Sequence, residues 1–110
     1  MKYMSVYILR CADDSYYVGV TNDIDNRLWE HQTGIHLKSY TFKRRPVTLV
    51  FVEHFFNADD AIAFEKQVKG WRRAKKEALI QGKWESLPEL SISYKEKMTR
   101  KLADDGNLRQ

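Results

Sequence analysis

Two β-type segments lie within the first 20 residues and are separated only by a short turn sequence. Residues 3–9 and residues 16–20 are both rich in β-branched and aromatic side chains, which is typical of strands. Residues 11–15 between them read Cys-Ala-Asp-Asp-Ser, a composition that favours a turn. The chain is therefore predicted to begin with a β-hairpin.

A helix is predicted directly after the hairpin. Asn22 is expected to be its N-cap, with Asp25 three residues later in a capping-box position. Gly34 is expected to end it after residue 33. Residues 35–46 show no clear period and are predicted to form a basic loop.

One more strand and two more helices follow. The apolar, β-branched residues 47–55 are the best candidate for a central strand. Asn57 is expected to cap a helix that runs to residue 69, and residues 71–80 are expected to form another. The resulting order β-β-α-β-α-α predicts a small α/β (α+β) domain with a mostly antiparallel sheet.

The length of 110 residues fits one domain, and 43% hydrophobic residues are enough for a core without covalent staples. We expect this domain to span residues 1–91 and residues 92–110 to form a tail that is partly helical or disordered. Cys11 is the single cysteine, so no intrachain disulfide can form and a cytoplasmic location is expected. The longest apolar run, residues 49–52, is too short to cross a membrane.

The net charge of +4 is concentrated in two basic segments, which favours nucleic acid as a partner. Phosphate contacts from such segments supply affinity without reading sequence. The predicted nucleic-acid-binding residues are Lys38, Lys43, Arg44 and Arg45 in the first segment and Lys69, Arg72, Arg73, Lys75 and Lys76 in the second.

Two polar residues lie beside the apolar stripe of the first predicted helix. Ile24 and Leu28 form that stripe, and at 100° per residue Arg27 falls about 60° and His31 about 20° from Ile24. An unpaired buried charge costs several kcal/mol. These groups therefore need a carboxylate, a solvent-lined cleft or a phosphate as a partner.

Glu65 occupies the corresponding position in the second predicted helix. It follows Ala61 by four residues and precedes Val68 by three, near the centre of the apolar stripe. A carboxylate there must be paired or bound to a metal ion. Metal binding and a structural ion pair with Arg27 both satisfy this requirement.

The hairpin strands each carry a tyrosine on a defined face. Because side chains alternate along a strand, Tyr7 shares a face with Ser5 and Leu9, and Tyr17 shares one with Gly19. A glycine inside a strand often marks the close approach of a ligand or of another backbone. Each tyrosine taken separately is equally compatible with core packing.

These residues together resemble the GIY-YIG nuclease family. Val6-Tyr7-Ile8 precedes Tyr17-Val18-Gly19 by ten residues and resembles the paired motif that names the family; Thr21, Arg27, His31 and Glu65 continue the pattern. The stretch from Lys69 to Lys76 is similar to small stand-alone bacterial members, which resemble the nuclease domain of the excision-repair incision subunit. The resemblance covers roughly residues 3–91.

The resemblance implies a three-stranded antiparallel sheet flanked by helices and a metal-dependent endonuclease that hydrolyses phosphodiester bonds in DNA, in repair or processing. It implies Tyr7 as general base, Tyr17 as a positioning group, Arg27 as a phosphate clamp and His31 as a proton acceptor or phosphate contact. Glu65 is implied as the ligand of one divalent ion, Mg²⁺ or Mn²⁺. A phenol with its ordinary pKa near 10 is a poor base, so Arg27 and the metal are expected to favour its deprotonated form.

Two other functions are compatible with the sequence. The first is a nucleic-acid-binding module that has the fold but cuts poorly, with a partner protein supplying target specificity. The second is a basic interaction domain in which the matched residues form a structural ion-pair cluster. DNA is favoured over RNA as the nucleic acid, and no membrane partner is expected.

Overall fold

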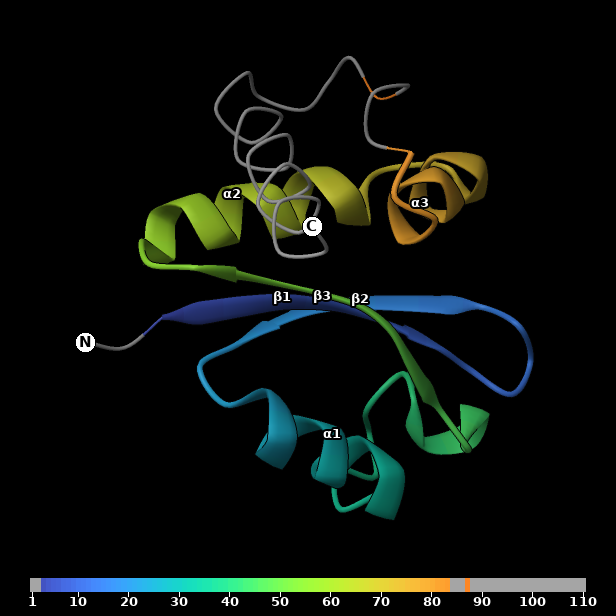
Figure 1. Ribbon diagram of the computed structural model, residues 1–110. Helices are drawn as coiled ribbons and strands as arrows, with labels where there is room; N and C mark the ends of the chain where they lie inside the picture. Colours follow the sequence, from blue (N-terminus) through green and yellow to red (C-terminus); the bar gives the residue numbers. More distant parts are fainter. Residues whose placement is uncertain (1–2, 84–86, 88–110) are drawn as a thin grey trace, which may run out of the picture. The chain divides into compact units, whose positions relative to one another are not determined.

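The computed structural model describes residues 3–83 and residue 87, and confirms the predicted order of elements. All three strands pair antiparallel in one sheet of order β2-β1-β3 (Figure 1). The fold is therefore a three-stranded antiparallel sheet with three helices, as the sequence predicted. The elements are β1 (Met4–Arg10), β2 (Tyr16–Thr21), α1 (Ile24–Thr33), the 3₁₀ helix η1 (Phe42–Arg44), β3 (Thr48–Phe55), α2 (Ala58–Lys69) and α3 (Arg73–Ile80).

The chain divides into two compact units, Met1–Arg73 and Ala74–Gln110. The sheet, α1 and α2 belong to the first unit, whereas α3 after its first residue belongs to the second. The predicted boundary after residue 91 and the predicted tail lie outside the described residues and stay predictions. Within the described part of the chain, no helix has the length and apolar character needed to cross a membrane.

The central strand is β1, so the expectation that residues 47–55 form the centre of the sheet is wrong. β1 pairs with β2 on one side and β3 on the other. Its residues Ser5 to Leu9 are all at most 1% exposed, because the strand is covered on both faces and both edges. Val52 of β3 is 37% exposed, as an edge strand allows.

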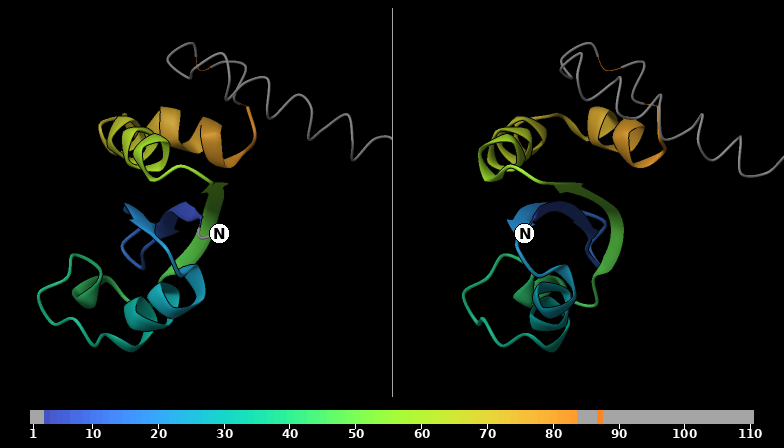
Figure 2. Two further views of the ribbon diagram at one scale, coloured as in Figure 1. Left: turned by 90° about the vertical axis from the view of Figure 1, so that its left-hand side faces the viewer. Right: turned by 60° about the vertical axis from the view of Figure 1, so that its left-hand side comes forward.

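The two faces of the sheet are covered by different helices. Figures 1 and 2 show α1 on one face and α2 on the other. On the α1 face, Tyr7 and Leu9 pack in a core cluster with Ile24 and Leu28 of the helix. On the α2 face, Phe64 packs against two aromatic rings of β3. The period-2 alternation of β1 therefore sends Tyr7 toward α1.

The helix termini follow the predicted chemistry with one shift. Asp23, rather than Asn22, is the N-cap of α1, and its carboxylate accepts a hydrogen bond from the backbone N–H of Asn26 at 3.1 Å. Gly34 ends α1 with φ of 70°, in the left-handed region that glycine enters without strain. Asn57 caps α2 as predicted, accepting from two backbone N–H groups.

The segment 35–46, predicted as an irregular basic loop, contains η1 and is fixed near its C-terminal end. The backbone N–H of Ala12 donates to the carbonyl of Arg44 at 2.8 Å, which ties the segment to the β1–β2 turn. The side-chain amide of Gln32 exchanges two hydrogen bonds with the backbone of Val47, at 2.6 and 3.3 Å. These contacts hold the segment against α1, where it completes the site described next.

Candidate active site

The two motif tyrosines converge on the α1 face of the sheet. Tyr7 is 1% exposed, and its ring centroid lies 6.2 Å from that of Tyr17. Tyr17 is two residues from Gly19, the residue of β2 that pairs with Tyr7, so both side chains leave the hairpin on the same face. The predicted face of Tyr7, shared with Leu9, and that of Tyr17, shared with Gly19, are therefore the same face of the sheet.

Gly19 provides the space that the Tyr7 ring occupies. A Cβ atom built on Gly19 would lie 2.5 Å from both Cζ and the hydroxyl oxygen of Tyr7. The close approach at this glycine is made by the tyrosine side chain of the neighbouring strand, whereas the sequence predicted a backbone or a ligand. Any larger residue at this position would displace the phenol.

His31 links the tyrosines to the segment after α1. Its Nε2 lies 2.9 Å from the Tyr7 hydroxyl, and its Nδ1 lies 2.7 Å from Thr41 Oγ1. Its ring also makes an edge contact with Tyr17, at a centroid distance of 5.2 Å. Burial, and then the positive charge of Arg27, lower the pKa of His31, so the imidazole is neutral at pH 7.

Arg27 reaches the same phenol from α1 and is itself part of an ion pair. Its Nε lies 3.1 Å from Glu30 Oε1, and its positive charge is near enough to Tyr7 to act on the pKa of that phenol in the lowering direction. The side chain is 40% exposed, so part of its donor fork faces solvent. The ion pair with Glu65 that the sequence left open is not made: Arg27 pairs with Glu30 on α1, and Glu65 pairs with Lys69 on α2.

The environment of Tyr7 opposes ionisation. Burial, followed by the neighbouring Tyr17, raises the pKa of Tyr7 to about 12, although Arg27 acts in the opposite direction. Arg27 does act in the expected direction, toward the phenolate. Burial and Tyr17 outweigh it, so the net effect of the protein's groups is to raise this pKa. At pH 7 about one in 10⁵ of these phenols is ionised.

Sequence reasoning missed the place of Thr41 in the site and the packing of Tyr40 on Tyr17, because both residues lie in a segment without periodicity. Thr41 is 1% exposed and holds His31. Tyr40 stacks on Tyr17 with ring centroids 6.0 Å apart, and the Arg44 guanidinium lies 3.8 Å from the centroid of the Tyr40 ring. A hydroxyl next to an aromatic residue in a basic loop gives no signal of burial, so only the fold places these side chains.

Glu65 is buried as predicted, but it comes from the other face of the sheet. It is 9% exposed on α2, and its Oε1 lies 3.8 Å from Nζ of Lys69. The tyrosines, Arg27 and His31 lie on the α1 face (Figures 1 and 2). Within the described residues, no group of three or more His, Cys, Asp or Glu side chains is placed to hold a metal ion.

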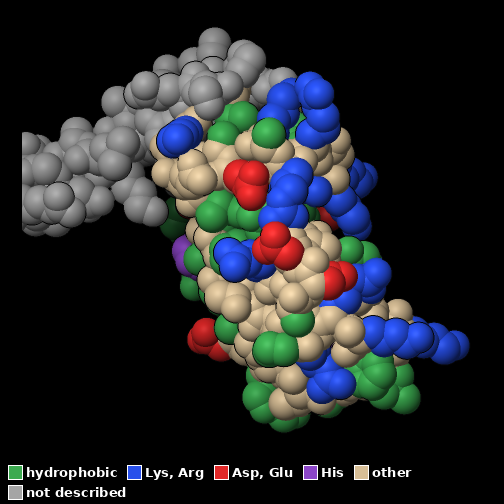
Figure 3. Space-filling model, turned by 90° about the vertical axis from the view of Figure 1, so that its right-hand side faces the viewer, with side chains coloured by type: hydrophobic (Ala, Val, Ile, Leu, Met, Phe, Trp, Pro, Cys, Tyr) green, Lys and Arg blue, Asp and Glu red, His purple; other side chains and the backbone are tan. Residues whose placement is uncertain are grey.

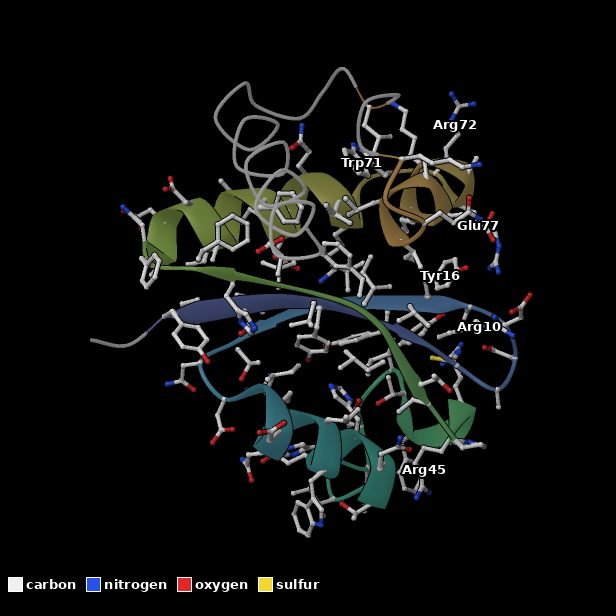
Figure 4. The ribbon with its side chains drawn as sticks, viewed as in Figure 1. Arg10, Tyr16, Arg45, Trp71, Arg72 and Glu77 are labelled. Atoms are coloured by element: carbon white, nitrogen blue, oxygen red, sulfur yellow. The ribbon has the colours of Figure 1, made fainter. Side chains whose placement is uncertain are left out.

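Lys and Arg side chains gather on one side of the molecule, with a few acidic groups among them (Figure 3). Several of these cations already have partners inside the protein. Arg44 pairs with Asp13 at 3.0 Å, and Arg73 pairs with Asp14 at 3.2 Å. Arg45 lies on the α1 side of the sheet and donates to the Phe42 carbonyl, whereas Arg72 lies on the α2 side (Figure 4).

The predicted nucleic-acid-binding residues thus fall into different structural groups. Lys38, Lys43 and Arg72 are exposed, and Lys69 pairs with Glu65. Lys75 and Lys76 lie on α3, in the second unit of the chain.

Tyr7, Tyr17 and His31 lie together on one face of this sheet. The family model described as GIY-YIG catalytic domain matches residues 3–78, and the chain is a member of the GIY-YIG family.

Its relatives include UPF0213 proteins of bacteria and archaea. One from Bacillus pumilus is 44% identical over 75 residues, which cover 68% of this chain and 76% of the relative. One from Halobacterium salinarum is 43% identical over 75 residues, covering 68% of this chain and 96% of the relative. The solution structure of a UPF0213 protein from Bacillus halodurans is 38% identical and covers 81% of this chain and 97% of its own, with a TM-score of 0.49.

Proposed function

We propose that this protein is a divalent-metal-dependent endonuclease that hydrolyses phosphodiester bonds in DNA. The observation that carries the proposal is the Tyr7 hydroxyl, which lies 2.9 Å from His31 Nε2 and is influenced by the positive charge of Arg27. A core tyrosine needs one partner for its hydroxyl. This one has a neutral imidazole that can accept a proton, and a cation that suits phosphate lies on the same side of the sheet.

Tyr7 acts in this proposal as a proton relay rather than as a stored phenolate. A water molecule attacks phosphorus and loses a proton to the Tyr7 oxygen, while Tyr7 passes its own proton to His31 Nε2. The bond from phosphorus to the leaving oxygen breaks, and that oxygen takes up a proton from solvent. Such a relay is needed because the pKa of Tyr7 is raised to about 12, which leaves almost no phenolate at neutral pH.

Arg27 and Tyr17 position the phosphate around this relay. The part of the Arg27 side chain that faces solvent can donate to a phosphate oxygen, a task for which the planar guanidinium fork is suited. Tyr17 lies against both Tyr7 and His31 and offers a hydroxyl to the phosphate or to the attacking water. Both groups act through geometry and charge, so no covalent intermediate with the protein is involved.

Glu65 is the residue that we propose to hold the metal ion. A single buried carboxylate does not enclose an ion, but it fits Mg²⁺ or Mn²⁺, since Mg²⁺ keeps several waters and takes one or two carboxylates together with substrate phosphate. When bound, the ion supplies charge stabilisation to the phosphate and the leaving oxygen. This role rests on the family's pattern and on the burial of Glu65, because Glu65 and the tyrosines come from opposite faces of the sheet.

A second function is favoured by two of the same observations. The raised pKa of Tyr7 suits a module that binds nucleic acid and cuts weakly by itself. The same holds for the contacts that Arg44, Arg45 and Arg73 make within the protein. A partner protein would then supply target specificity. The pathway served, in repair or in other DNA processing, is part of the proposal and follows from the resemblance alone.

One experiment separates the two functions. Purified full-length protein is incubated with labelled branched, nicked and single-stranded DNA, and with RNA of matched sequence, in Mg²⁺, in Mn²⁺ and in chelator. Metal-dependent cutting that Tyr7→Phe abolishes supports the nuclease. Binding without cutting by wild type in every metal condition supports the binding module and contradicts the nuclease.

A further inference from the structure

The environment of His31 contains a group whose role the proposed reaction does not yet use. Thr41 is 1% exposed, and its Oγ1 lies 2.7 Å from His31 Nδ1 and 2.9 Å from Ser39 Oγ. The backbone N–H of Thr41 also donates to Ser39 Oγ, at 3.2 Å. This buried hydroxyl is fixed by short hydrogen bonds on both sides.

The donors and acceptors along this row favour one direction. The positive charge of Arg27 acts on Tyr7, which favours a hydroxyl oxygen turned toward Arg27 and a hydroxyl proton directed toward His31 Nε2, 2.9 Å away. A neutral imidazole carries one N–H, so an Nε2 that accepts requires the proton on Nδ1. Thr41 Oγ1 is placed to accept a hydrogen bond from that Nδ1–H, and its own hydroxyl can donate a hydrogen bond to Ser39 Oγ.

We infer that Thr41 is a positioning residue that holds His31 in the Nδ1-protonated tautomer, with Nε2 free to take the proton of Tyr7. The inference rests on the proposed function for its consequence, but the tautomer is a property of the folded protein without substrate. A histidine held in the opposite tautomer would present an N–H to Tyr7 and could accept nothing from it. The partner of the remote ring nitrogen therefore decides whether the relay can work.

Three variants separate positioning from packing. Thr41→Val keeps the volume and removes the hydroxyl, Thr41→Ser keeps the hydroxyl and removes a methyl group, and Thr41→Ala serves if the valine variant does not fold. None of these changes alters the groups proposed to touch substrate. A packing role would make serine and valine comparably harmful, whereas a positioning role requires that serine rescue the protein and valine not.

The first measurement is the ¹⁵N NMR spectrum of the His31 ring in the substrate-free protein at neutral pH. We expect an N–H signature at Nδ1 and an unprotonated signature at Nε2 in wild type and in Thr41→Ser. The two signatures should mix or exchange in Thr41→Val or Thr41→Ala. An Nε2-protonated ring in wild type overturns the inference, and so does an unchanged tautomer in both hydroxyl-free variants.

The second measurement is metal-dependent DNA cleavage by the same proteins. We expect kcat of Thr41→Val to fall by about 10- to 10³-fold with KM unchanged, in the range seen when a group that orients a catalytic histidine is lost. Thr41→Ser should stay within about threefold of wild type, since its hydroxyl can still accept from Nδ1. An unchanged kcat in Thr41→Val overturns the inference. Absence of cleavage in wild type contradicts the proposed function instead, and the NMR result then decides the tautomer alone.

Discussion

The ring of Tyr7 lies across the backbone of Gly19, its partner residue in the neighbouring strand, so closely that a single added methyl group would overlap the phenol. Because Gly19 has no side chain, the Tyr7 ring can lie at this place on β2, and this fixes the position of its hydroxyl relative to Arg27 and His31. One structural position controls the packing of the central strand and the geometry of the proposed relay. Its consequences for stability and for activity are both measurable.

Gly19→Ala should lower the free energy of unfolding by about 1–3 kcal/mol, the usual cost of overpacking a core, and should displace Tyr7 from His31. Urea unfolding measures the first effect and DNA cleavage the second. Gly70→Ala is the matched control, because an added Cβ there meets nothing closer than 3.6 Å and φ is −81°. Equal effects of the two substitutions would contradict the close contact of Tyr7 with Gly19.

Tyr7→Phe should keep the packing of the ring and reduce cleavage by at least ~10²-fold, as is typical when a general base is lost. Arg27→Ala should lose phosphate stabilisation. The double variant should be scarcely slower than the slower single variant, because both residues act in one transition state. Single-turnover rates measured for all four proteins test this, and rate losses that simply multiply would show that Tyr7 and Arg27 act independently.

Glu65→Gln should abolish metal-dependent cleavage while the far-ultraviolet spectrum and the unfolding midpoint stay close to wild type. The reason is that the amide keeps the size of the buried side chain but no longer binds a divalent ion. Lys69→Met is the control, since it removes the cation 3.8 Å from Glu65 and leaves the carboxylate. Cleavage at the wild-type rate by Glu65→Gln in Mg²⁺ would remove the metal role, and unfolding of that variant would indicate a structural ion pair.

Replacing Lys38 and Lys43 together by Gln should weaken DNA binding about equally across sequences. Both lysines are exposed, and each lost phosphate contact should reduce the slope of log affinity against log salt by about 0.9 on duplex DNA. Arg44→Gln should instead act on the fold, because Arg44 holds Asp13 and Tyr40. DNA-binding titrations at several salt concentrations measure this slope. An unchanged slope in the double variant would exclude residues 35–46 from the binding surface.

The protein should lose stability as the pH falls below the ordinary histidine pKa of about 6.5, because His31 is held neutral in the fold. In this pH range the unfolded chain binds a proton at His31 and the folded protein does not. The free energy of unfolding therefore falls by at most about 1.4 kcal/mol per pH unit, and the fall levels off below the folded pKa. The charged groups that act on His31 are Arg27, Glu30 and His36. Cleavage should fall only at lower pH, as the pH passes through the lowered pKa of folded His31, since a protonated His31 accepts nothing from Tyr7.

Urea unfolding at a series of pH values measures this contribution. His31→Gln should remove it from the stability profile, whereas His36→Gln, a change at an exposed histidine, should leave most of it. Parallel pH profiles for wild type and His31→Gln would show that another group is responsible.

The sequence alone determined the elements and the chemistry that they carry. Strand-type composition, the caps at Asn57 and Gly34, and the polar residues on helix faces are local properties, and each was visible in a window of a few residues. Those windows predicted the order β-β-α-β-α-α and singled out Tyr7, Tyr17, Arg27 and His31, which the fold does bring together. The resemblance of the motif residues to the GIY-YIG family added the reaction.

The tertiary structure decided which of these groups face one another. That β1 is central depends on pairing with strands on both sides, which no local pattern contains. The burial of Thr41 against His31 depends on a segment without periodicity that is tied back to the hairpin turn. The placement of Glu65 on the face opposite Tyr7 follows from which side of the sheet each helix covers. Contacts between residues distant in the chain arise only when the whole sheet and both helical layers form together, and a short window of sequence carries no information about them.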